Sequence, residues 1–211
     1  MRQIVSSLQL SAAVDNAVCL AQTRGTAGAL TINGGNAVNG VAIFNAAYAV
    51  TVTSTGNDST RTYTITGTNA AGNALTETIT GPNATTVSTT SAFLTVTEIL
   101  VVGGGTVGTV RAGFAAPGVT APLPLDNHGR PDISLQVVVS GTVTWTVQQT
   151  LDNPFTVNIP TWFDHPDTNM VSQTVNRQGN YAYVPAAVRL RVTSGTGRAT
   201  LTIIQSGDNR A

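Results

Sequence analysis

The sequence contains no lysine and few charged residues of any kind. Charged residues make up 9% of the 211-residue chain, and ten arginines balance ten acidic residues to a formal net charge of zero. An average soluble domain is about 25% charged. Nucleic-acid binding needs clustered basic side chains that neutralise phosphates, whereas these arginines are scattered from Arg2 to Arg210. We therefore expect no direct nucleic-acid binding. So neutral a surface is typical of a chain whose faces are covered by partner proteins in a permanent assembly. For the same reason we expect a homo-oligomer.

Cysteine and long apolar runs are also scarce. Cys19 is the single cysteine, and its small apolar neighbours predict a buried packing residue without a disulfide. The apolar stretch 92–102 contains Thr and Glu and is shorter than the roughly 20 residues of a spanning helix. Polar residues such as Gln3, Ser6 and Gln9 stand where a signal peptide needs its apolar core. These features predict no membrane segment and folding in a cytosol.

Period-two alternation of apolar and polar residues dominates the chain after about residue 28. Helical periodicity is nearly absent, and Gly- and Asn-rich turns separate the alternating segments, which is typical of antiparallel β structure. We predict an all-β, antiparallel β-sandwich or jelly-roll-like fold. The predicted strands are 29–33, 41–53, 61–66, 74–80, 92–102, 107–113, 133–139, 142–150, 181–184, 188–193 and 199–205.

The stretch TYTITGTNAAGNALTETIT at 62–80 places threonine at every second position on both sides of an AAGN turn. The pattern predicts a hairpin with one threonine face. Threonine favours strand geometry, and its short side chain loses little entropy when another protein docks on it. A docking surface and plain strand propensity on a solvated face both explain the pattern. The candidate interface residues are Thr62, Thr64, Thr66, Thr76, Thr78 and Thr80.

Proline divides the chain near its middle. Pro117, Pro122, Pro124 and Pro131 interrupt the alternation and predict an extended connector. The predicted organisation is an extended N-terminal arm that lies along a neighbouring molecule, an N-terminal β domain, a Pro-rich connector and a C-terminal β-sandwich domain. Their predicted bounds are 1–26, 27–113, 114–132 and 133–211.

The C-terminal segment is predicted to begin with a tight hairpin that turns at Ser140 and Gly141. The segment 151–179 is rich in Pro, Asn and Asp and predicts a structured surface loop. The predicted core residues of this domain are Trp145, Val147, Tyr181, Tyr183, Leu190 and Ile203.

Two motifs suggest chemistry that their surroundings do not support. Gly103, Gly105 and Gly108 match GxGxxG, but a dinucleotide site needs a helix to follow, and here a strand follows. The motif therefore predicts a glycine-rich hairpin turn. WFDHPD at 162–167 gathers carboxylates around His165, as a metal site or general base would. The other histidine, His128, stands alone in the connector.

No second cluster completes the WFDHPD site, so we predict no catalytic residue, no metal and no cofactor. We expect Trp162 and Phe163 to pack inward and Asp167 to cap a turn. The same two aromatic residues remain candidate interface residues. Together with Asp164 they are also the one cluster that a glycan-binding module could use.

Two runs resemble virion proteins of tailed bacteriophages. The first carries GND, TITGT, ETITGPN and FLTVT within 53–99, and the second carries TVTWTVQQTLDNPF, WFDHP and GNYAYVPAAVRLRV within 142–205. The resemblance covers roughly two thirds of the chain and implies a β-sandwich structural protein; it implies no catalytic residues that could be carried over. It implies a place in the virion, assembled in the bacterial cytoplasm, and the major capsid protein or other virion proteins as partners.

Three functions follow as expectations. The first is a capsid decoration, or cement, protein that bridges and stabilises capsid subunits. The second is an adaptor in the neck, the tail or a fibre base. The third is a β-sandwich module that binds a cell surface or a glycan.

Overall fold

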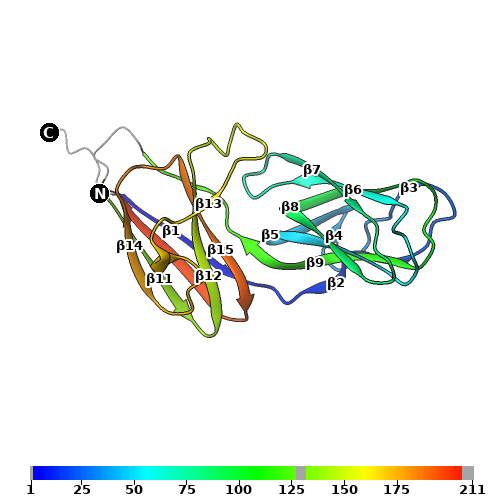
Figure 1. Cartoon of the computed structure of the whole chain (residues 1–211), viewed down its shortest axis with the longest axis horizontal. Coiled ribbons are helices and arrows are strands. Elements are labelled where there is room, and N and C mark those ends of the chain that lie inside the picture. Colours follow the sequence, from blue (N-terminus) through cyan, green and yellow to red (C-terminus); the bar gives the residue numbers. More distant parts are fainter. Residues whose placement is uncertain (1, 127–131, 206–211) are drawn as a thin grey trace. The chain divides into compact units, whose positions relative to one another are not determined.

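The computed structural model describes residues 2–126 and 132–205, and β-strands make up most of this part of the chain (Figure 1). The described strands form large antiparallel sheets, which confirms the predicted all-β, sandwich-like fold. In chain order the elements are β1 (Arg2–Gln9), β2 (Val14–Gln22), β3 (Gly28–Ala29), β4 (Ala37–Val38), β5 (Val41–Ser54), β6 (Thr62–Thr68), β7 (Ala74–Thr80), β8 (Thr86–Val102), β9 (Val110–Val119), β10 (Leu123–Pro124), β11 (Ile133–Ser140), β12 (Val143–Thr150), β13 (Phe163–Asp164), the 3-10 helix η1 (Thr168–Met170), β14 (Arg177–Tyr181), β15 (Ala187–Gly195) and β16 (Arg198–Gln205).

The chain forms two compact units. Unit 2 is continuous and comprises Ala12–Ala116, whereas unit 1 combines Met1–Ser11 with Pro117–Ala211. The division differs from the predicted one, because the first strand belongs to the same unit as the last. His128 and the rest of 127–131 lie outside the described residues, as do residue 1 and 206–211.

Unit 1 is a sandwich of two antiparallel sheets. One sheet has the strand order β1-β16-β11-β14, and the other contains β13, β12 and β15, with β10 and the last residues of β9 paired to β15. Alternate residues of β11 and β16 are buried, as a half-buried strand requires. Fully buried side chains such as Trp145, Leu201 and Ile203 fill the core, and each aliphatic one contributes roughly 1.5–3 kcal/mol.

The predicted hairpin at Ser140 and Gly141 is wrong. β11 pairs with β16 and β14, whereas β12 pairs with β15 and β13, so the turn carries the chain from one sheet to the other. A second crossing turn, between β15 and β16, lies beside it, and the Gly197 amide donates to the Thr142 carbonyl at 2.8 Å. In sequence, a tight turn between two alternating strands is compatible both with a hairpin in one sheet and with a crossing from one sheet to the other.

Unit 2 is built on two long strands, β5 and β8, which pair with each other and with neighbours on both sides. The order continues from β8 through β6 to the edge strand β7, and from β5 through β9 to β2. Phe44, Tyr48 and Phe114 form an aromatic cluster with ring centroids 4.8 to 6.1 Å apart. Register shifts within β5–β8 and β6–β8 mark bulges that bend the long strands.

The predicted N-terminal arm and Pro-rich connector are both partly strand. Residues 2–9 pair with β16 over their whole length, and β2 follows at Val14–Gln22. The arm prediction missed β1 because its partner lies almost two hundred residues away in the sequence. In the connector, β9 runs through Pro117 to Val119, and proline is tolerated there because the chain changes partners from β2 to β15 around this residue.

Most of the predicted core is confirmed. Trp145, Val147, Tyr181, Leu190 and Ile203 are buried, as is Cys19, and burial raises the pKa of the Cys19 thiol to about 12. The prediction was wrong for Tyr183, which is 43% exposed. It lies beyond the end of β14, and its hydroxyl accepts a hydrogen bond from Gln149 Nε2 at 2.5 Å.

Candidate functional site

The six candidate threonines of 62–80 lie opposite one another on β6 and β7. The cross-strand pairs are Thr62 with Thr80, Thr64 with Thr78 and Thr66 with Thr76. The hydroxyls of Thr64 and Thr78 are hydrogen-bonded at 2.9 Å. The predicted hairpin is therefore confirmed, and we call these six residues the threonine face.

The opposite side of the hairpin fixes the orientation of the threonine face. Tyr63 and Ile65 on β6 are fully buried, and Leu75 on β7 is buried as well. A shift of one residue in register would expose these three side chains, so burial specifies the register strongly. Cross-strand threonine pairs add roughly 0.2–1 kcal/mol each.

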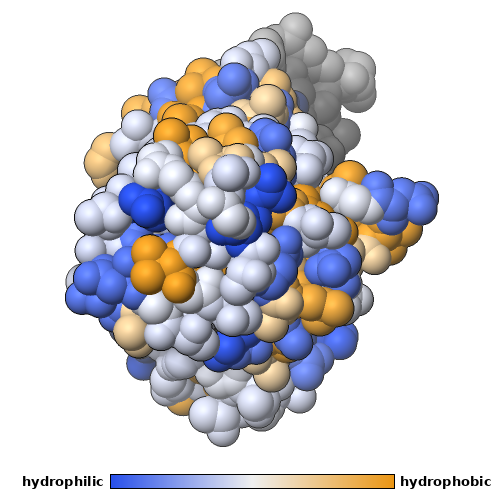
Figure 2. All heavy atoms as spheres, turned by 90° about the vertical axis from the view of Figure 1, so that its right-hand side faces the viewer, coloured by the Kyte–Doolittle hydropathy of each residue, from blue (hydrophilic) through white to orange (hydrophobic). Residues whose placement is uncertain are grey.

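The threonine face continues onto β8, where the exposed Glu98 is a charged residue. Val102, Leu100 and Glu98 lie opposite Thr62, Thr64 and Thr66, and Val102 is largely exposed. Farther along, the hydroxyls of Thr68 and Thr95 are 2.7 Å apart. Figure 2 shows one face of the molecule, on which residues of intermediate hydropathy predominate and hydrophilic and hydrophobic residues are interspersed.

Glu77 ties the hairpin to β8. Its carboxylate accepts hydrogen bonds from the Thr90 amide at 2.7 Å, the Thr90 hydroxyl at 3.0 Å and the Ser91 amide at 2.8 Å. Burial acts to raise the pKa of the carboxyl, but these hydrogen bonds favour the charged form more strongly, and the pKa is lowered. Glu77 therefore holds the outer strand of the threonine face in place as a carboxylate.

Trp162 in unit 1 is held by an arginine. The guanidinium carbon of Arg189 lies 4.1 Å from the centroid of the Trp162 ring, a cation–π contact. Arg189 Nε donates to Gln148 Oε1 at 2.9 Å, and Gln148 Nε2 donates to Asp164 Oδ1 at 2.9 Å. Burial and the neighbouring Arg191 lower the pKa of Arg189, and Asp164 opposes them. The guanidinium covers one face of the indole ring, so a glycan cannot stack on that face.

Phe163 does not pack inward as predicted. It is 61% exposed, because the short strand β13 pairs with β12 and turns this side chain to solvent. Four other large apolar side chains before it in the same loop are also exposed. We call this group the apolar loop; its members are Leu151, Phe155, Val157, Ile159 and Phe163.

The apolar loop is held in shape by polar contacts, which confirms the predicted structured surface loop. The Thr161 amide donates to Asp152 Oδ2 at 2.7 Å, and the Val157 amide donates to the Asn153 carbonyl at 2.9 Å. Exposed large apolar side chains that gather in one segment can mark a binding surface, and here five come from one loop. Sequence reasoning missed these members except Phe163, although the alternation Phe155, Val157, Ile159 between two prolines was a visible signal.

His165 is placed as a structural residue. Its ring is buried against Tyr181, with the ring centroids 4.5 Å apart, and Nδ1 accepts the Asp167 amide at 3.0 Å. Burial lowers the pKa of His165, and the Asp167 carboxylate and the backbone of Asn180 oppose that effect. Asp167 caps η1 by accepting from the Asn169 amide at 2.9 Å, which confirms the predicted cap. In the described ranges no three His, Cys, Asp or Glu side chains gather as metal ligands.

The GxGxxG glycines lie in a loop between β8 and β9, followed by a strand as predicted. The predicted hairpin turn is wrong, because β8 and β9 both pair with β5, which lies between them, and not with each other. Arg61 packs on this loop, and its Nε donates to the Gly105 carbonyl at 2.9 Å. Beside it, Asp58 is fully buried and accepts the Val107 amide at 2.7 Å and the Ser54 hydroxyl at 2.5 Å. Asp58 therefore holds this loop against the rest of unit 2, and no pattern in the sequence indicated that role.

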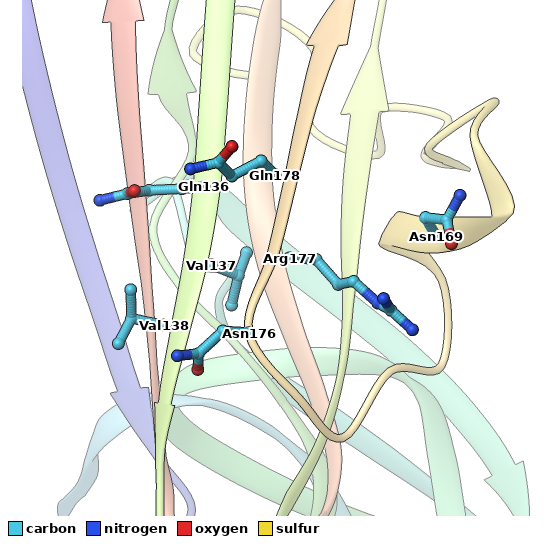
Figure 3. Close-up of a pocket in the computed structure, with 7 residues that line it drawn as sticks. All are labelled: Gln136, Val137, Val138, Asn169, Asn176, Arg177 and Gln178. Carbon is cyan, nitrogen blue, oxygen red and sulfur yellow. The ribbon is translucent and has the colours of Figure 1, made fainter.

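A hollow of about 550 Å³ lies over β11 and β14 in unit 1. Figure 3 shows the amides of Gln136 and Gln178, which are cross-strand neighbours, and Arg177, which reaches toward Asn169. The lining also contains Val137, Val138 and Asn176 and has no carboxylate. These amide and guanidinium groups can form hydrogen bonds, but the lining brings together no acid and base.

Comparison with known proteins finds no matching family model, no similar curated protein and no similar solved structure. Within residues 2–126 and 132–205, no helix has the length and apolar character needed to cross a membrane.

Proposed function

We propose that this chain is a structural protein of a tailed bacteriophage particle, and specifically a capsid decoration protein. It would attach to the assembled shell and bridge neighbouring subunits of the major capsid protein, without catalysis. The observation that carries this proposal is the threonine face, a sheet surface with short, uncharged side chains that face one another in pairs. The resemblance of 53–99 and 142–205 to virion proteins supplies the biological setting.

The threonine face suits docking on thermodynamic grounds. Immobilising a long, flexible side chain at an interface costs about 0.5–1.5 kcal/mol, a cost that β-branched threonine largely avoids. The hydroxyls of Thr64 and Thr78 already satisfy each other, so covering them leaves fewer unpaired polar groups. A second protein can therefore cover this face at a small entropic and desolvation cost.

Bridging requires two binding surfaces on one chain, and each unit supplies one. Unit 2 has the threonine face, and unit 1 has the apolar loop with the exposed Leu151, Ile159 and Phe163. Once one surface is bound, the second binds at a high effective concentration, so two weak contacts give stable attachment. Repetition of the bridge over a symmetric shell would then distribute mechanical stress among capsid subunits.

The first experiment is the copy number of this chain in purified particles, measured by quantitative mass spectrometry against the major capsid protein. A decoration protein follows the shell lattice, so a ratio of about one to one, or a simple fraction of it, is expected. A few copies in multiples of about six would instead assign the chain to the neck or tail. Absence from the particle would overturn the structural role altogether.

Variants then test the surface itself. Thr64→Lys combined with Thr78→Lys places two charges on the threonine face and should abolish binding to particles that lack this protein. Thr26→Lys is the matched control, because Thr26 is exposed in the same unit but lies outside the strands. Equal binding by the double variant and the control would contradict the proposed role of the threonine face.

A further inference from the structure

Strand β1 exposes an unprotected edge. It lies at the end of the order β1-β16-β11-β14, and no described strand pairs with its outer side. It pairs with β16 in an unbroken register from Arg2 to Gln9, without a bulge, and residues 3–9 contain neither proline nor a charged residue. Sheet edges in soluble proteins normally carry such features to prevent pairing with another chain.

Two other outer strands, β7 and β14, carry such protective features. On β7, Glu77 is a charged residue in the middle of the edge, and its carboxylate bonds back to Thr90 and Ser91. β14, at the far end of the β1 sheet, has only five residues and begins with the charged Arg177. In contrast with β7 and β14, the outer edge of β1 carries none of these features along residues 3–9.

The sequence of β1 is complementary to itself in the antiparallel direction. If the two copies are related by a two-fold axis perpendicular to the sheet, the cores of both copies lie on the same side of the joined sheet. Residues that lie opposite each other across the two β1 strands then belong to the same face. With the axis at Ser6, Ile4 lies opposite Leu8 of the second copy on the core side, and Gln3 lies opposite its Gln9 on the outer side. The alternating burial along β1 supports this assignment of faces, because Ile4, Ser6 and Leu8 on the core side are less exposed than their neighbours.

We infer that the occupant of the β1 edge is β1 of a second copy of this chain. The two strands pair antiparallel around Ser6 and join the two sheets into one continuous sheet across the dimer. The pairing satisfies the open backbone groups of the edge and covers the half-exposed Ile4 with the partner's Leu8. It also brings the exposed Val5 beside the partner's Ser7. This dimer goes beyond the proposed function and does not depend on it.

Cysteine cross-linking of the full-length chain tests the register. Ser6→Cys lies on the axis and should give a covalent dimer under mild oxidation by oxidised glutathione. Gln3→Cys and Gln9→Cys should each fail alone, because equivalent residues are then separated by six positions, about 20 Å, but their mixture should cross-link. Cys19 is buried, so the unmodified chain provides a clean background. Ready cross-linking of Gln3→Cys alone would overturn the register.

Sedimentation equilibrium tests the dimer without a cross-link. Val5→Lys places a charge beside the axis and should weaken the dimer at least tenfold, about 1.4 kcal/mol. Val138→Lys is the matched control, because Val138 is exposed on the same face but lies on β11, away from the edge. A wild-type chain that is monomeric at high micromolar concentration, or a dimer that Val5→Lys leaves intact, would refute the inference.

Discussion

The Arg189 guanidinium lies over the Trp162 ring at 4.1 Å, and through Gln148 it is connected to Asp164. This contact joins the last part of the apolar loop to two strands of the sandwich core, β12 and β15. It explains how a loop with five exposed large apolar residues keeps a defined shape. The loop is therefore a preformed surface whose geometry depends on a residue outside it.

Arg189→Met should loosen the apolar loop. The variant keeps an unbranched apolar side chain in place of the aliphatic part of arginine but loses the cation–π contact, worth about 0.5–2 kcal/mol, and the hydrogen bond to Gln148. Chymotrypsin should then cleave faster within 151–164, with a small loss of stability of unit 1. Arg191→Met, two residues along the same strand, should be neutral or slightly stabilising, because Arg191 opposes the charge on Arg189. Equal cleavage rates in the two variants would refute this role for Arg189.

Acidification should destabilise unit 1 through His165. Burial lowers the folded-state pKa of this histidine below its ordinary value of 6.5, so the unfolded chain binds more protons around that pH. The contribution of His165 to stability is therefore complete above pH 6.5 and is lost as the pH falls below it. His165→Gln keeps a hydrogen-bond acceptor but cannot titrate.

The measurement is urea denaturation at pH 7.5 and pH 5.5, followed by tryptophan fluorescence. Both tryptophans, Trp145 and Trp162, lie in unit 1 and so report on it. Wild type should lose more stability than His165→Gln between the two pH values. His128 is present in both proteins and cancels in the comparison. Identical losses would show that His165 does not titrate as its burial implies.

Local patterns predicted the strands well where the partner is close in sequence. The β6–β7 hairpin was predicted almost to the residue, because alternation and the AAGN turn both lie within 62–80. The pairing of β1 with β16 left no local signal, and the turn at Ser140 and Gly141 gave a misleading one. Strand pairing between distant segments depends on packing of the whole core, which alternation alone does not encode.

The candidate site was also predicted only in part, because a local pattern fixes the direction of some side chains and not of others. The orientation of the six threonines follows from the two-residue period, whereas Phe163 was predicted inside and lies outside. A single aromatic residue in a loop has no period to fix its direction, and the pairing of β13 with β12 decides it.

Gly67→Ala should strongly destabilise unit 2. Gly67 lies at the bulge between β6 and β8, and an added Cβ would overlap the carbonyl oxygen of Thr95. The backbone must shift to relieve this clash, so a loss of about 3 kcal/mol is expected. Gly35→Ala is the control, because nothing lies within 4 Å of a Cβ there. Calorimetry of both variants checks the difference, and a Gly67→Ala protein as stable as the control would show that the bulge relaxes freely.

Asp58→Ala should destabilise unit 2 far more than removal of a surface carboxylate. Asp58 is fully buried, and its loss leaves the Val107 amide and the Ser54 hydroxyl without their acceptor. Unpaired buried groups cost about 1–3 kcal/mol each, so a total of roughly 2–4 kcal/mol is expected. Asp15→Ala is the matched control, because Asp15 forms an exposed ion pair with Arg111 at 2.5 Å, and such pairs contribute at most about 1 kcal/mol.

Asp58→Asn separates hydrogen bonding from charge in the same position. Asparagine keeps an oxygen for the Val107 amide, and its Nδ2 can donate to Ser54 Oγ, so most of the contacts are retained. Its unfolding free energy should lie between those of wild type and Asp58→Ala, measured by circular dichroism in urea. An Asp58→Asn variant as unstable as Asp58→Ala would show that the negative charge holds the glycine-rich loop. A wild-type-like Asp58→Ala would show that neither the charge nor these hydrogen bonds do so.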